Sequence, residues 1–254
     1  MIAGIIRVLF NMLLKRTYIK NPNCEALTEA QQRALSIGAV LSINNFEYYN
    51  SLRTCRAGKD AKSLKESWGI TTKDEAVDTL EWLKNEGHRK AFNEFLHNAA
   101  DAFSPRSIGK YNFTQLDNLK EALPELCQRG FVGGPGALPE EDFRASMLEN
   151  INAAAWDMGR MVNVARWCYD NGYISEEQAW EYILAAESES ASVYSGWEEF
   201  GKSYIIGRAL WNGADGAGLS CFMDIVEKLL KDAKSPWVLF PFISRAKEEK
   251  EAVI

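Results

Sequence analysis

One segment, Leu148 to Tyr169, constrains the fold most, because it is apolar on nearly every side when drawn as a helix. At about 100° per residue, one face carries an unbroken apolar stripe of Leu148, Ile151, Ala155, Met158, Val162 and Ala165. The opposite face carries Trp156, Arg160 and Trp167. A helix that is apolar all round is buried among other elements. The segment therefore predicts a central buried helix.

The charges on this helix are informative, because an unpaired charge is very costly to bury. Asp157 and Arg160 are three residues apart, so their side chains lie on one flank, close enough to pair. Arg166 lies on the other flank. We expect Arg166 either to reach a different partner or to extend its long stem towards solvent.

A second segment, Trp197 to Trp211, has the same character. Its aromatic residues Trp197, Phe200, Tyr204 and Trp211 fall within one arc, and Arg208 lies in that arc. Arg208 is therefore directed at whatever the aromatic rings pack against. We expect it to pair with a carboxylate of another helix, with Asp157 the first choice, or to stack on the aromatic rings.

The two helices together define a candidate polar cluster or pocket. Its members are Asp157, Arg160, Arg166, Ser203, Tyr204 and Arg208, with aromatic packing by Trp156, Trp167, Trp197 and Trp211. A lattice of aspartate and arginine between packed helices is more often architecture than catalysis, and we favour architecture here. In the alternative interpretation, the arginines converge on a pocket that binds an anion.

Helix signals dominate the rest of the chain. Three capping boxes, each a Ser or Thr followed three residues later by Glu or Gln, precede apolar residues at helical spacing: Thr28/Gln31, Thr72/Glu75 and Ser175/Gln178. Further helices are expected at 89–103, 113–128, 140–169, 195–211 and 219–232. No alternating run of β-branched residues indicates a strand. The sequence predicts an all-α protein, a single compact multi-helix domain of roughly nine to eleven helices.

Two segments fall outside this pattern. Residues 130–139 are rich in glycine and proline and predict a loop inside a helical globular domain that covers 21–254. Residues 1–20 predict a separate apolar helix. We favour packing of that helix on the domain, and contact of residues 2–16 with a membrane surface is the less favoured alternative.

Composition excludes several classes of function. A net charge of −6 disfavours nucleic-acid binding. The five cysteines are scattered, which argues against a disulfide framework or a zinc site and suits a cytoplasmic location. His88 and His97 would face opposite ways on a straight helix and could not share a metal. We therefore expect no metal and no cofactor.

Several motifs also resemble a bacterial family, the domain of unknown function 1266. The resemblance spans roughly Ala61 to Trp237. It is carried by Glu86-Gly87-His88-Arg89, Trp156-Asp157-x-Gly159-Arg160 and Ser203-Tyr204-x-x-Gly207-Arg208. It implies a helical bacterial protein, and it implies no activity or ligand.

Two functions remain open. The first is a non-enzymatic module that binds another protein, such as an immunity-type inhibitor of a bacterial toxin, since an acidic chain suits a basic partner. The second is an enzyme or a small-anion-binding protein built on the pocket between the two central helices, with Asp157 as a general base. The lack of a recognisable nucleophile or metal set makes us favour the first, non-enzymatic function.

Overall fold

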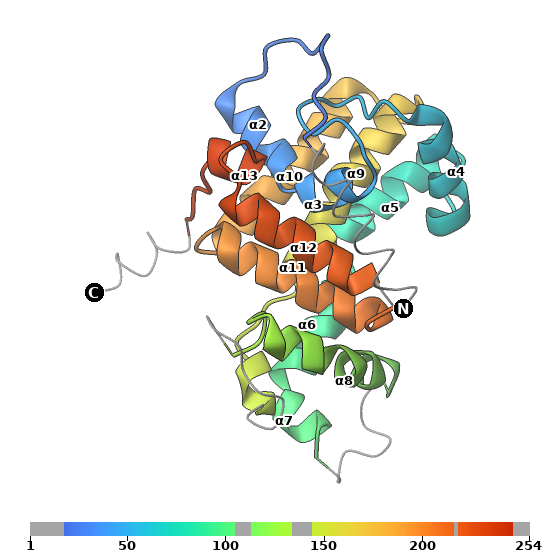
Figure 1. Ribbon diagram of the computed structural model, residues 1–254. Coiled ribbons are helices and arrows are strands. Elements are labelled where there is room, and N and C mark those ends of the chain that lie inside the picture. Colours follow the sequence, from blue (N-terminus) through green and yellow to red (C-terminus); the bar gives the residue numbers. More distant parts are fainter. Residues whose placement is uncertain (1–17, 105–112, 134–143, 216–217, 246–254) are drawn as a thin grey trace, which may run out of the picture.

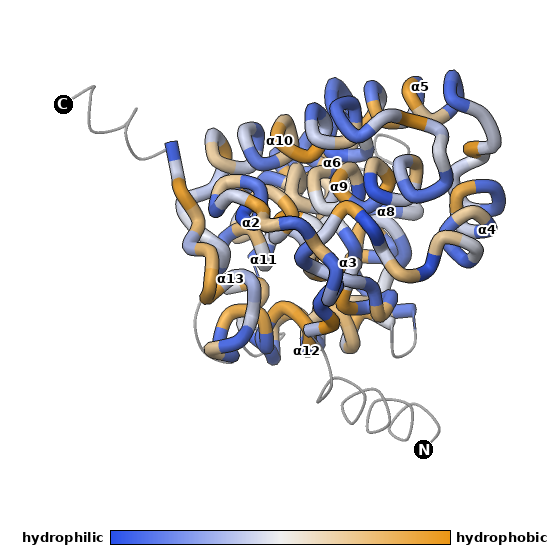
Figure 2. The backbone as a smooth tube through the Cα atoms, turned by 90° about the horizontal axis from the view of Figure 1, so that it is seen from above, coloured by the Kyte–Doolittle hydropathy of each residue, from blue (hydrophilic) through white to orange (hydrophobic). Residues whose placement is uncertain are grey.

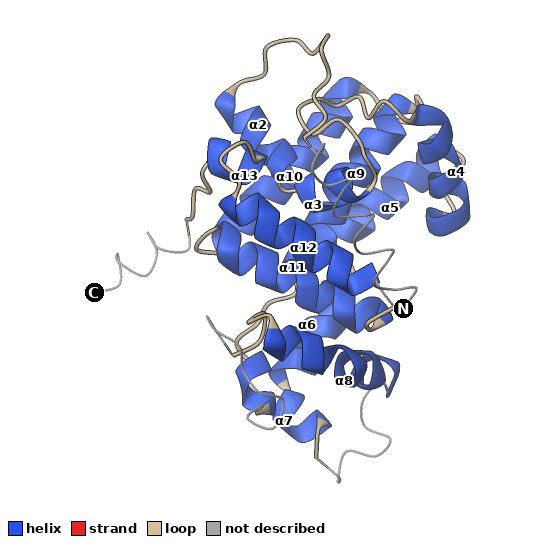
Figure 3. Ribbon diagram, viewed as in Figure 1, coloured by secondary structure: helices blue, strands red, loops and turns tan. Residues whose placement is uncertain are grey.

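The computed structural model describes residues 18–104, 113–133, 144–215 and 218–245 (Figure 1). Within these ranges every regular element is a helix (Figure 3). They include ten α-helices of six or more residues and two of four residues. This confirms the predicted all-α, single-domain fold.

The three capping boxes are confirmed as helix starts. Thr28 caps α2 (Glu29–Ser36), Thr72 caps α5 (Lys73–Asn85) and Ser175 caps α10 (Glu176–Val193). In each box the hydroxyl accepts from the backbone N–H three residues on, and that residue's side chain accepts from the backbone N–H of the capping residue. Local side-chain chemistry therefore sets these boundaries.

The other described helices are α3 (Ala39–Asn44), α4 (Ala57–Trp68), α6 (Arg89–His97), α7 (Ala99–Ala102), α8 (Phe113–Gln128), α9 (Ala154–Asp170), α11 (Trp197–Asn212), α12 (Gly218–Lys231) and α13 (Pro236–Leu239). The expected helix over 89–103 divides at Asn98, whose side chain donates to the carbonyl of Glu94. A side chain that bonds its own backbone in this way competes with continued helix formation.

The expected helix over 140–169 begins later than predicted. A short 3₁₀ turn, η3 (Ala145–Leu148), comes first, and α9 starts at Ala154. The side chain of Asn152 accepts from the N–H of Ala154 at 2.9 Å, which is the kind of bond that opens a helix. Residues 140–143 of that prediction lie outside the described residues.

Helix α9 occupies the centre of the domain, as predicted. Every residue from Ala154 to Cys168 is buried. The helix packs against α10, α11, α5, α4 and α3, and α12 lies beside α11 on the far side (Figure 1). In α10 and α12 only part of each helix is buried, and apolar and hydrophilic residues are mixed along both (Figure 2).

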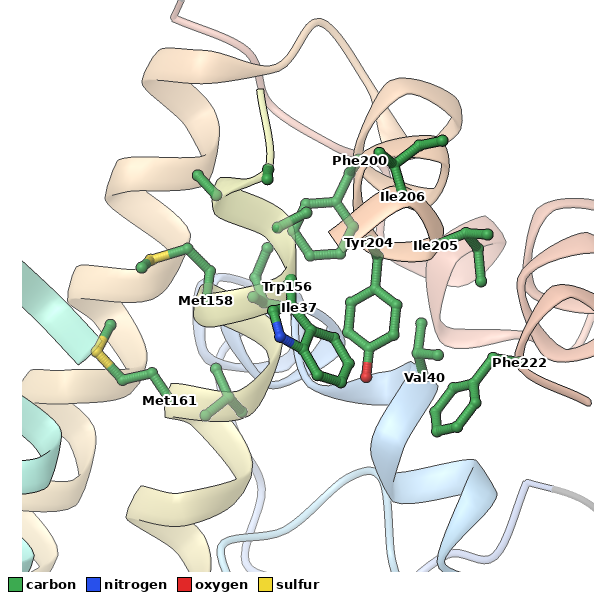
Figure 4. Packing of buried hydrophobic residues seen from close by; sticks show 14 of the residues in the cluster. Ile37, Val40, Trp156, Met158, Met161, Phe200, Tyr204, Ile205, Ile206 and Phe222 are labelled. Carbon is green, nitrogen blue, oxygen red and sulfur yellow. The ribbon is translucent and has the colours of Figure 1, made fainter. Parts of the chain in front are cut away.

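Aromatic residues pack α9 against α11. Figure 4 shows the ring of Trp156 from α9 beside Tyr204 from α11, with Phe222 from α12 beyond it. The Trp156 and Tyr204 ring centroids are 5.2 Å apart in an edge-to-face arrangement. The backbones approach closely, because a Cβ atom on Gly207 would lie 2.5 Å from the Cβ of Trp156. A larger residue at 207 would push the two central helices apart.

The two exceptional segments are only partly described. Residues 18–20 are not helical, and the rest of the expected N-terminal helix, 1–17, lies outside the described residues. Residues 130–133 form a turn and bend after α8, whereas the remainder of the predicted loop, 134–139, lies outside them too. None of the helices in the described ranges has the length and apolarity needed to cross a bilayer.

Candidate functional site

Asp157 and Arg160 form the predicted pair. Arg160 Nη2 donates to Asp157 Oδ1, and the backbone N–H of Arg89 donates to Asp157 Oδ2 at 2.7 Å. Arg89 Nη1 lies 3.6 Å from the same Oδ2. Both carboxylate oxygens are therefore engaged, and Asp157 holds the start of α6 against α9.

Gly87 makes this arrangement possible. Its φ is +59°, in the left-handed region, and a Cβ atom there would lie 2.0 Å from Asp157 Oδ2. Only glycine meets both demands at low cost. The turn it makes places the His88 ring beside Arg160, with 2.8 Å between Nδ1 of His88 and Nη2 of Arg160.

His88 is a site residue that sequence reasoning missed, because the histidines were considered only as shared metal ligands. Burial and the neighbouring Arg160 lower the pKa of His88. A neutral ring can accept the Arg160 hydrogen bond at Nδ1 and so orient the guanidinium. The sequence signal for His88 was its place in Glu86-Gly87-His88-Arg89, because a glycine turn directly before a helix fixes where the next side chains point.

Arg208 does not pair with Asp157, and that prediction was wrong. Its Nη2 donates to Asp215 Oδ2 at 2.9 Å, in the loop that follows α11. Gly213 turns the chain back there, with φ of +60°. The expected stacking on rings is confirmed, because the guanidinium lies over Trp211 at 5.2 Å and over Phe222 at 5.5 Å.

Arg166 belongs to a separate centre on the opposite flank of α9, as predicted. It is buried and does not reach solvent. It donates to Ser42 Oγ at 2.7 Å, to the carbonyl of Ser51 at 3.0 Å, and to the carbonyl of Tyr48. Its Nη1 lies 3.7 Å from Glu47 Oε2. Arg166 thus fastens the irregular segment 45–56 to the central helix.

Ser203 and Tyr204 are also buried, and they differ in their bonding. Ser203 donates to the carbonyl of Asn152 and lies 2.7 Å from the Tyr194 hydroxyl, so it joins α11 to the start of α9. The Tyr204 hydroxyl is buried, and no described residue forms a hydrogen bond with it. Burial raises the pKa of Tyr204, and Arg160 and Arg208 oppose that shift, so the hydroxyl stays protonated at neutral pH.

The four tryptophans predicted to pack divide into two groups. Trp156, Trp167 and Trp197 are buried. Trp167 donates to Glu47 Oε1 at 3.0 Å, and Trp197 stacks on Trp237 with ring centroids 5.0 Å apart. Trp211 instead is 48% exposed, which corrects its expected place in the core.

A cavity of about 580 Å³ opens where these groups meet. Its lining includes Arg160 and Arg208, and neither Asp157 nor Tyr204 reaches it. Side chains from α3, α4, α5, α9, α11 and α12 contribute: Leu41, Asn45, Ser63, Ser67, Trp68, Thr79, Trp82, His88, Trp156, Arg160, Trp167, Arg208, Trp211 and Phe222. Volumes of roughly 300–1,000 Å³ are typical of small-molecule sites.

One side of the cavity alternates aromatic rings and cations. We call it the Arg–Trp wall, and it runs through Trp68, Arg160, Trp156, Trp211, Arg208 and Phe222. The Arg160 guanidinium lies over Trp156 at 4.5 Å and over Trp68 at 5.4 Å. The Trp156 and Trp211 rings, 5.8 Å apart, separate the two cations.

The Arg–Trp wall has more donors than acceptors. Nη1 of Arg208 and Nε1 of Trp156 are buried and have no hydrogen-bond partner among the described residues. Arg160 uses Nε and Nη2, and its Nη1 donates to no group in the described part of the chain. Buried donors normally find acceptors, and these two have almost no accessible surface, so an acceptor in the cavity would reach them only after a shift of the side chains of the wall. No group of three His, Cys, Asp or Glu residues in the described ranges is placed to hold a metal ion.

Comparison with known proteins assigns the chain to a family and gives no activity for it. A family model described as "Protein of unknown function (DUF1266)" matches residues 63–242, a range that includes Arg160 and Arg208. The chain is 25% identical over 155 residues to an uncharacterized protein of Escherichia coli strain K12, YbeR, covering 60% of this chain and 58% of that protein. The chain thus spans less than two thirds of this relative's length. No solved structure matches. Because the family model covers well over half of the sequence, the chain belongs to the DUF1266 family.

Proposed function

We propose that the protein binds a small organic anion in the cavity beside the Arg–Trp wall. The observation that carries this proposal is Arg208, which lines the cavity and whose buried Nη1 has no partner in the part of the chain that the structure describes. An arginine fork presents its donors in the geometry that a carboxylate or phosphate accepts. An anion in the cavity would supply the missing acceptor once a shift of the Arg208 side chain exposed this nitrogen.

The surroundings of the arginines strengthen such an interaction. Five indole rings line the cavity, and a low local dielectric makes each charged hydrogen bond stronger than in water. Arg160 has one carboxylate partner, Asp157. Arg208 also has one, Asp215, whose side chain is 52% exposed. Arg208 therefore keeps much of its positive potential for a ligand.

Binding without turnover is the form of this function that we favour. Asp157, the general base that an enzyme would need here, has both oxygens engaged and does not line the cavity. An enzymatic role therefore has less support than simple binding.

The test is a titration with non-aromatic acids, octanoate and ribose 5-phosphate, followed by tryptophan fluorescence. We expect saturable quenching, and Arg208→Ala should weaken binding at least about tenfold, as expected for the loss of a charged hydrogen bond. The control is Arg33→Ala, which removes an ion-paired, mostly buried arginine that does not line the cavity. Equal binding by both variants, or the absence of saturation with these two acids and also with aromatic acids of similar size, would refute the proposal.

A second candidate is the protein-interaction module expected from the sequence. Trp82 and Trp211, which are 37% and 48% exposed, support it, because exposed tryptophans anchor many interfaces. The net charge of −6 suits a partner that is basic overall. The cationic cavity would accept a single acidic side chain of that partner. An immunity-type role and a cytoplasmic location stay predictions. The test of the interaction is a pull-down in which the Trp82→Ala and Trp211→Ala variants compete with the unmodified chain for the captured protein.

A further inference from the structure

We infer that the ligand of this cavity is a planar aromatic acid, whose ring lies against Trp211 and whose acid group meets Arg208. This inference rests on the proposed anion binding and adds the chemical class of the anion. The evidence is the placement of the tryptophans, the position of Arg208 over an indole face, and the polar side chains that also line the cavity.

Tryptophan is concentrated at the cavity. The chain has eight tryptophans, and five of them line this one space. Trp82 and Trp211 are the two exposed tryptophans of the described residues, and both belong to the five. Leaving two large rings partly in water is unfavourable for a free protein, and a ring of the ligand would cover them.

Arg208 places the acid group close to a ring. Its guanidinium carbon lies 5.2 Å from the centre of the Trp211 ring. A carboxylate or phosphate bound to Arg208 therefore lies beside the indole, and the atoms attached to the acid group extend along it. A flat ring uses this surface better than a flexible alkyl chain, because it loses less conformational freedom on binding.

The lining of the cavity also includes uncharged polar side chains. Ser63 and Ser67 from α4, Thr79 from α5 and Asn45 after α3 line it. Hydroxyl and amide side chains offer both donors and acceptors, which suit hydroxyl, amino or ring-nitrogen substituents. A one- or two-ring acid with such substituents fits a cavity of about 580 Å³.

The experiment compares matched ligand pairs that differ only in the ring. Isothermal titration calorimetry is run on the full chain with 2-naphthoate against its fully saturated analogue, and with adenosine monophosphate against ribose 5-phosphate. We expect the aromatic member of at least one pair to bind about tenfold tighter, as stacking on an aromatic side chain usually gives. The pair that binds identifies the acid as carboxylate or phosphate.

Two variants locate the effect. Trp211→Leu should reduce the ratio of the affinities of the aromatic and non-aromatic members of a pair to less than about threefold, because it removes the ring and keeps an apolar side chain. Arg208→Gln should weaken both members of a pair by a similar factor and leave their ratio unchanged. Trp180→Leu, at a tryptophan of α10 that does not line the cavity, is the matched control and should behave as the unmodified chain does.

The outcomes separate this inference from the function on which it rests. Equal binding of aromatic and saturated acids would overturn the inference and leave anion binding standing. An aromatic preference that survives Trp211→Leu would also overturn it, because the ring would then lie elsewhere. No binding of any of the four acids would overturn both proposals.

Discussion

Arg166 and Arg208 are both buried arginines on the two central helices, and they differ in how their donors are used. A guanidinium has five N–H groups. Those of Arg166 meet the carbonyls of Ser51, Tyr48 and Arg53 and the side chains of Ser42 and Asn163. Within the described ranges Arg208 makes one such bond, to Asp215, and its Nη1 has no partner.

The number of hydrogen bonds distinguishes an architectural arginine from a functional one better than burial does, because the two residues are 1% and 5% exposed. A fully bonded buried charge fixes a fold and has nothing left to offer a ligand. An incompletely bonded one beside a cavity keeps binding capacity at some expense in stability. Arg160 is intermediate, since its Nε and Nη2 are bonded and its Nη1 is not.

The largest effect is expected from Arg166→Ala. The substitution leaves three backbone carbonyls without their donor and removes the cation that lies 3.7 Å from buried Glu47, so the free energy of unfolding should fall by about 4–5 kcal/mol. Urea denaturation measures it. Arg53→Ala removes the exposed partner of Asp170 in the same region; it is the control and should change stability much less, because the Arg53 side chain is 57% exposed. Similar losses from the two variants would argue against an architectural role for Arg166.

Asp157→Ala should have the next largest effect, about 3 kcal/mol, because it leaves buried Arg160 without its carboxylate and the Arg89 N–H without an acceptor. Thermal and urea denaturation measure the loss. Asp157→Asn keeps one acceptor oxygen and should lose less. A normal melting curve for Asp157→Ala would show that the Asp157 contacts are not needed for the fold.

Glu47 predicts a smaller, pH-dependent effect at the Arg166 centre. Burial raises the pKa of Glu47 to about 7 from an ordinary value of 4.5, against the opposing influence of Arg166. The folded state thus holds this proton more tightly than the unfolded state. The contribution of Glu47 to stability is therefore complete below pH 4.5 and is lost as the pH rises through about 7.

The expected loss over that interval is on the order of 2 kcal/mol, measured as the free energy of unfolding from pH 5 to pH 8. Glu47→Gln should flatten the profile while it keeps an acceptor for Trp167 Nε1. Glu187→Gln, at the ion pair with Arg33, serves as the control. A profile with the same slope for the Glu47→Gln variant would assign the pH dependence to other groups.

Patterns local in sequence predicted the helices and part of the site. The three capping boxes, the bounds of α8, the burial of α9 and the Asp157–Arg160 pair all depend on residues a few positions apart. The partner of Arg208 could not be found in this way, because Asp215 lies beyond the end of α11 after a glycine turn.

The acceptors of Arg166 were hidden from sequence analysis for another reason. Three of them are backbone carbonyls of an irregular segment, and every residue type carries such a group. The cavity depends on side chains from six helices, which only the packed fold brings together. Sequence periodicity reports which face of a helix is buried, and it does not report which buried charge is left incompletely bonded.

The central claim is that Arg166 holds the fold whereas Arg208 serves a ligand. Its most direct test is the free energy of unfolding of Arg208→Ala, measured by urea denaturation beside that of Arg166→Ala. Because Asp215 is half exposed and the lost bond is single, Arg208→Ala should change stability by less than about 1 kcal/mol. A loss as large as that of Arg166→Ala would contradict the claim and make Arg208 a part of the architecture.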